Sequence, residues 1–142
     1  MKYLIAILIA SFLGLNTLAQ KDHVDSLILN INNDQLHGTC HYVWVIEMKS
    51  TYGDSLIKIG KSITPKLVPL LIDKEKGIIV HYILSNIWMD TVKFSSNFHL
   101  PTIEYNYCGL IFYEKNEHIF TKDSFLNENK KKWIEIINKS SR

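Results

Sequence analysis

Apolar residues recur three or four positions apart near the start of the chain, between residues 22 and 31. This spacing is that of one face of a helix. The turn-forming run Asn-Asn-Asp at residues 32–34 ends the pattern, and a second helix is expected over residues 35–48. Together these two segments predict a first helical hairpin, whose apolar positions in the first helix are Val24, Leu27, Ile28 and Ile31.

Residues 54–88 predict a second helical hairpin. A short apolar helix ends at Gly60, which suits a helix C-terminus. A helix opens near Pro65, where a missing backbone N–H is tolerated, and Pro69 is expected to disturb it one turn later. After a charged turn at residues 73–76, an apolar helix is expected from Ile78 to Trp88.

The C-terminal third predicts a mixed cap. Residues 89–101 are polar and irregular and are expected to be a loop. The aromatic and β-branched runs 109–113 and 118–121 predict a β-hairpin, which needs the helices to pack against because an isolated hairpin is marginal in water. A final helix is expected from about Asp123, with an apolar stripe of Leu126, Trp133 and Ile137 flanked by Ile134 and Ile136.

The two predicted hairpins resemble each other at an offset of about 40 residues, the period of HEAT-type arrays. Superposed in this way, Leu27 falls on Leu67, Ile31 on Leu71, and the dipeptide His41-Tyr42 on His81-Tyr82. The chain therefore resembles a HEAT-like helical repeat protein. The resemblance implies a mainly α fold, with two HEAT-like helical hairpins that share one core plus a C-terminal β-hairpin and capping helix.

The first 19 residues have the pattern of a secretory signal peptide. Lys2 precedes an apolar run from Tyr3 to Leu15, and Thr17-Leu18-Ala19 supplies small residues at a cleavage site after Ala19 or Gln20. The alternative is an uncleaved amphipathic or core helix. We expect an exported protein, periplasmic or extracellular, with a single domain over residues 20–142. No later apolar run reaches the roughly 20 residues of a membrane span, so none is expected in the mature chain.

Composition and charge limit the possible partners. The 142 residues are 46% hydrophobic, enough for one core, and 16 Lys+Arg against 14 Asp+Glu leave a formal charge of +2. Nucleic acid is not implied, because phosphate-binding faces show a clear basic excess. The run Lys130-Lys131-Lys132 is interpreted as a solvated helix face.

The two cysteines, Cys40 and Cys108, allow one disulfide in an oxidising compartment. Such a bridge would close a long loop and stabilise the fold by about 3–4 kcal/mol. The alternative is two buried free thiols that pack as small apolar groups.

The spacing His37-x-x-Cys40-His41 is the one metal-like pattern, because positions i, i+3 and i+4 share a helix face. No fourth ligand is evident, so we predict neither a metal nor a cofactor. No catalytic sequence motif occurs, and an enzyme is not expected.

The echoed residues His41, Tyr42, His81 and Tyr82 are candidates for a polar binding seam between neighbouring helices. The alternative is a set of hydrogen-bonded core or rim residues. A second candidate surface is a group of aromatic residues, which are enriched at binding hot spots but could equally fill the core. These are Tyr105, Tyr107, Phe112, Tyr113 and Phe120.

These patterns favour an exported module that binds another protein through its stacked helices. One narrower version is an envelope immunity or inhibitor protein, although no charge excess is present that would steer a charged partner. Another alternative is an enzyme, for example a hydrolase, with a pocket joining His41, His81 and a carboxylate such as Glu47. A purely structural envelope protein would instead have a smooth surface.

Overall fold

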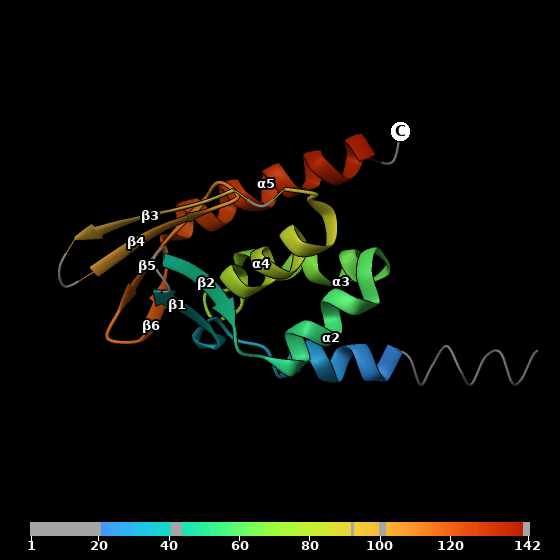
Figure 1. The fold of residues 1–142 in the computed structure, drawn as a ribbon. Helices are drawn as coiled ribbons and strands as arrows, with labels where there is room; N and C mark the ends of the chain where they lie inside the picture. The colour runs from blue at the N-terminus through green and yellow to red at the C-terminus, as the bar shows by residue number, and fades with distance from the viewer. Residues whose placement is uncertain (1–20, 41–43, 92, 100–101, 141–142) are drawn as a thin grey trace, which may run out of the picture.

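The protein has an α+β fold in which helices and two antiparallel sheets surround a central helix (Figure 1). The computed structural model describes residues 21–40, 44–91, 93–99 and 102–140. The prediction of a mainly α fold is therefore wrong.

The N-terminal segment combines a helix with a β-hairpin. Residues 21–29 are helical, as predicted, and the 3-10 turn η1 (Asn33–Gln35) leads into β1 (Leu36–Cys40) and β2 (Trp44–Met48). These strands pair antiparallel, with Leu36 opposite Met48. The predicted helix over residues 35–48 does not form.

The side chains of β1 and β2 explain why these residues form strands rather than a helix. Around Val45 and Ile46 the residues are β-branched or aromatic, and exposed Val45 and Glu47 alternate with buried Ile46, as on a half-buried strand. Gly38 matters for packing, because a Cβ at this position would overlap the hydroxyl of Tyr105. The glycine thus allows β1 to lie against the larger sheet.

Helices occupy most of residues 51–88, but they form a series of short helices and 3-10 turns before α4 rather than the predicted second hairpin. α2 (Thr51–Ile59) ends at Gly60, which has a φ of 79°. The chain continues through η2 (Gly60–Ile63), α3 (Thr64–Leu67) and η3 (Val68–Ile72). Pro69 has no N–H for a helical hydrogen bond, so the chain tightens into a 3-10 turn at this point.

The central helix α4 (Gly77–Trp88) confirms the helix predicted from Ile78 to Trp88. Most of its side chains are buried, which fits a sequence that is apolar on nearly every side. Its first turn is capped from outside the helix, because the Asn33 side-chain oxygen accepts hydrogen bonds from the N–H groups of Ile78 and Ile79, each at 3.0 Å.

The C-terminal third contains a four-stranded sheet in the order β3-β4-β5-β6. Its strands are β3 (Phe94–His99), β4 (Thr102–Tyr107), β5 (Leu110–Lys115) and β6 (His118–Phe120). The predicted hairpin corresponds to β5 and β6. The predicted loop over residues 89–101 is wrong where β3 forms, because the polar run Ser-Ser-Asn gains its hydrogen-bond partners from β4.

The final helix α5 (Asp123–Ser140) confirms the helix predicted from Asp123. It lies along the sheet and over η3 and α4 (Figure 1). Buried Leu126 and Trp133 join the core, which also takes in Val24 and Ile31 from the first segment.

The HEAT-like resemblance is overturned by these elements. Residues 22–31 and the stretch 64–72 are both largely helical or turn-like, but residues 36–40 and 44–48 form strands where the echo requires the counterpart of α4. The apolar pattern of these residues was compatible with a helix or with a strand. Hydrogen bonding between β1 and β2 favoured the strands.

Candidate functional site

His81 lies at the centre of the molecule, where α4, β4 and α5 meet. It is 1% exposed. Its Nδ1 accepts a hydrogen bond from the Trp133 indole N–H at 2.9 Å, so its Nε2 carries the proton and donates it to the carbonyl oxygen of Tyr107 at 2.7 Å. Both ring nitrogens are thus engaged within the core, and neither is available as a base for a substrate.

Burial keeps His81 uncharged. Desolvation lowers the pKa of its imidazole from 6.5 to about 4, and the positive charge of Lys132 acts in the same direction. Hydrogen bonds to Tyr107 and Asn129 favour the charged form but are smaller effects. The imidazole is therefore a neutral crosslink between helix and sheet at neutral pH.

Tyr82, the next residue on α4, is half-buried and stacks on Tyr107 with ring centroids 5.0 Å apart. Burial raises the pKa of the Tyr82 phenol, and the negative charges of Asp54 and Glu47 raise it further. Asn86 donates a hydrogen bond to the Tyr107 hydroxyl at 3.2 Å. These contacts tie α4 to the sheet.

The predicted binding seam of His41, Tyr42, His81 and Tyr82 is described only in part. His41 and Tyr42 lie outside the described residues, so the pairing of His41-Tyr42 with His81-Tyr82 stays a prediction. The same holds for the disulfide, because Cys108 is half-buried in the turn after β4 while the side chain of Cys40 lies outside what the structure describes.

The metal-like spacing around His37 loses its geometric basis. Residues 37–40 belong to strand β1, where positions i, i+3 and i+4 do not share a face. Among the described residues, no group of three or more His, Cys, Asp or Glu side chains is arranged to hold a metal ion.

The five aromatic residues of the C-terminal third divide between core and surface. Tyr105, Tyr107 and Phe112 are buried on the inner face of the sheet. Tyr113 and Phe120 stack on one another at 5.7 Å near the end of the sheet, and Phe120 is exposed.

A groove between helical elements is lined mainly by apolar side chains. It has a volume of about 360 Å³. Residues from η2, α3 and η3, from the end of α4 and from the last turns of α5 line it. They are Lys61, Thr64, Pro65, Val68, Pro69, Trp88, Ile134, Ile137 and Asn138. A hollow of similar size near η1 is instead lined mostly by polar side chains, including Asn32, Asp34 and Lys74.

Trp88 is a fixed wall of this groove. Its indole N–H donates a hydrogen bond to the Thr64 hydroxyl at 2.9 Å, and the Lys61 ammonium lies 4.4 Å from the ring centroid. The first contact orients the ring, and the second is a cation–π contact that holds a positive charge beside it. Opposite, Ile134 of α5 is 42% exposed.

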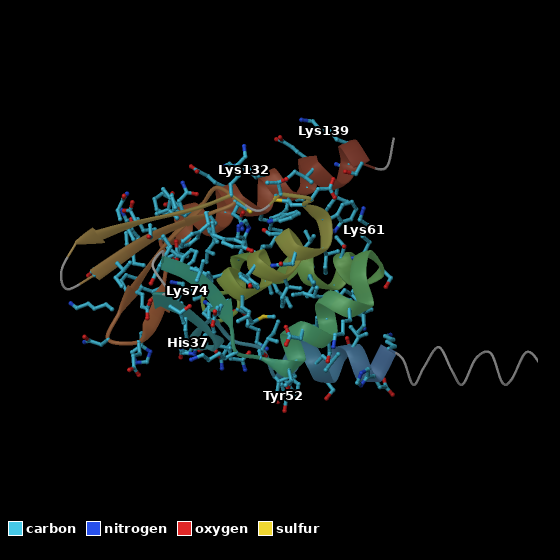
Figure 2. The ribbon with its side chains drawn as sticks, viewed as in Figure 1. His37, Tyr52, Lys61, Lys74, Lys132 and Lys139 are labelled. Carbon is cyan, nitrogen blue, oxygen red and sulfur yellow. The ribbon has the colours of Figure 1, made fainter. Side chains whose placement is uncertain are left out.

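Figure 2 places Lys61 beside the helical end of the molecule, whereas Lys132 and Lys139 project from the outer side of α5. Within the lysine run predicted to be a solvated helix face, Lys131 and Lys132 are exposed, whereas Lys130 is partly buried. Lys132 and Lys139, seven residues apart, lie on the outer side, and Lys130 lies one turn before Ile134.

Sequence reasoning missed the groove, although one signal was present. The apolar stripe of α5 is wider than its contact with the core requires, because Ile134 and Ile137 lie beside buried Trp133. Trp88 was interpreted only as the end of an apolar helix. Nothing local indicated that residues 61–69, 88 and 134–138 would meet.

Comparison of the chain with models of known protein families, with curated proteins and with solved structures found no match. In the described part of the chain, no helix is both long and apolar enough to span a bilayer.

Proposed function

We propose that the protein is an exported binding module that holds an apolar segment of another protein in the groove between α3, the end of α4 and α5. Support for export comes from the signal-like pattern of residues 1–19. The surface differs from the stacked-helix surface expected at first, because the helices do not form a repeat.

The observation that carries this proposal is the fixed Trp88 ring in an apolar groove. Tryptophan is enriched among residues that dominate binding energy, and a ring already held by Thr64 loses little conformational entropy when a partner binds. Two prolines of the lining, Pro65 and Pro69, stiffen the backbone that follows Thr64. A preformed apolar groove of this kind is a common way to hold a short peptide segment.

Photo-crosslinking from the groove tests the proposal. A benzoylphenylalanine at Ile134 would lie against the bound segment, and we expect it to give one discrete crosslinked product that mass spectrometry identifies as a protein. The matched control carries the same residue at Leu29, which is 76% exposed on the helix of residues 21–29, outside the groove.

The same crosslink should be lost when Pro69 is replaced by Asp, because a carboxylate at this exposed position would make the wall polar. Equal products from positions 134 and 29, or no product from position 134, would count against the proposal.

A further inference from the structure

We infer that the segment held in the groove carries a carboxylate next to its apolar side chains, and that Lys61 binds this carboxylate. The inference rests on the proposed function and specifies the chemistry of its partner. It starts from the charges around the groove, where Lys61 is the one charged residue among the described residues of the lining.

Lys61 has no carboxylate partner among the described residues. Two acidic residues elsewhere on the surface, Asp25 and Asp123, are paired with Lys66 and with Lys74, the latter at 2.9 Å. Asp90, two residues beyond Trp88, forms no ion pair with Lys61. The Lys61 ammonium is therefore positioned by Trp88 but is not neutralised.

A second positive charge lies near the groove residue Ile134. Lys130 is one turn before Ile134 on α5, and it also forms no ion pair with a described carboxylate. An apolar segment without charge would cover the groove but would leave these ammonium groups partly desolvated. A segment with a nearby Asp or Glu would instead offset the cost of desolvating these ammonium groups by placing a carboxylate beside them. Its apolar side chains would exclude water and so strengthen the ion pair between carboxylate and ammonium.

The size of the groove limits the occupant to a short element. A hollow of about 360 Å³ accepts a few side chains, such as the apolar ridge of an amphipathic helix, rather than a domain surface. The partner chemistry is thus a short amphipathic peptide with an acidic residue beside its apolar ridge.

Two fluorescent probes separate the charge from the apolar surface. 8-Anilinonaphthalene-1-sulfonate combines apolar aromatic rings with a negatively charged sulfonate, and N-phenyl-1-naphthylamine has the same rings without the charge. We expect Lys61→Gln to weaken binding of the anionic probe about three- to fivefold, the range of a partly exposed ion pair, and to leave the uncharged probe unchanged. Ile134→Asn should weaken both probes. The matched controls are Lys139→Gln, on the outer side of α5, and Leu29→Asn, and neither should change either probe.

Peptide and vesicle competition then identifies the occupant. An amphipathic peptide with leucines at helical spacing and flanking glutamates should displace the anionic probe more strongly than the same peptide with flanking lysines. If both peptides compete equally, or Lys61→Gln affects neither probe, the carboxylate inference is overturned while the groove stands. If Ile134→Asn affects neither probe, the groove and the proposed function fail together. Displacement by vesicles of phosphatidylglycerol but not by the acidic peptide would overturn the peptide assignment.

Discussion

At the scale of single residues, His81 shows how a residue that resembles a catalytic group can be a structural one. It sits on an apolar helix, which is compatible with a core role or with a base in a pocket. Its contacts show that the role is structural, because the Trp133 indole N–H donates to one ring nitrogen and the Tyr107 carbonyl oxygen accepts from the other. A neutral imidazole suits this position because it is donor and acceptor at once.

This arrangement predicts a pH dependence of stability. The pKa of His81 is about 4 in the folded protein, while the unfolded value is 6.5. Above pH 6.5 the histidine is neutral in both states and contributes no proton linkage. As the pH falls from 6.5 to 4, only the unfolded state gains the proton, so the free energy of unfolding should fall by about 3 kcal/mol in total.

Urea unfolding between pH 4 and pH 7.5 measures this effect. His81→Gln keeps a donor and an acceptor but does not titrate, so its stability should fall less steeply over the same range. Equal slopes for wild type and His81→Gln would contradict the assignment.

At the scale of elements, the start of α4 depends on a residue 45 positions earlier. Asn33 is 3% exposed, accepts hydrogen bonds from two N–H groups of the first turn, and donates one to the carbonyl oxygen of Lys74 at 2.8 Å. This amide therefore serves as an N-cap supplied by another segment.

Replacing Asn33 by Ala should lower the free energy of unfolding by about 2–4 kcal/mol, because three hydrogen bonds are lost and buried N–H groups are left unpaired. Denaturant unfolding measures the loss. Asn30→Ala is the matched control, since Asn30 is exposed and bonds only within its own helix through its side chain. A cost below about 1 kcal/mol for Asn33→Ala would mean that water replaces the cap.

Element types were predictable where local chemistry was decisive. Gly60, Pro65 and the apolar run after residue 77 determine helix ends and a helix interior. Residues 36–40, 44–48 and 94–99 were not predictable in this way. Their strands form because a partner strand satisfies the backbone, which no local window contains.

At the scale of the whole molecule, one core joins the helices to the larger sheet. It runs from Val24 through α4 to Trp133 and includes Tyr105 and Phe112 of the sheet. The single domain expected over residues 20–142 stays a prediction, and this shared core gives it a test.

Unfolding should be one cooperative transition, because neither the helices nor the sheet can keep a buried face without the other. Urea melts followed by tryptophan fluorescence and by far-UV circular dichroism should have the same midpoint. Trp133→Phe should shift both midpoints down together, since it removes the bond to His81. Separate midpoints for the two signals would show two independent units.

The candidate site belongs to this largest scale. Trp88 and Ile134 could each be recognised as apolar from the sequence, but their meeting with Pro65 requires the path of the whole chain. The amino-acid sequence alone determined the signal-like N-terminus, the central helix, the final helix and the β5–β6 hairpin, because periodicity, glycine and proline act over a few neighbouring residues. The tertiary structure alone decided the two sheets, the neutral role of His81 and the groove beside Lys61, because these depend on backbone pairing and burial between residues far apart in the chain.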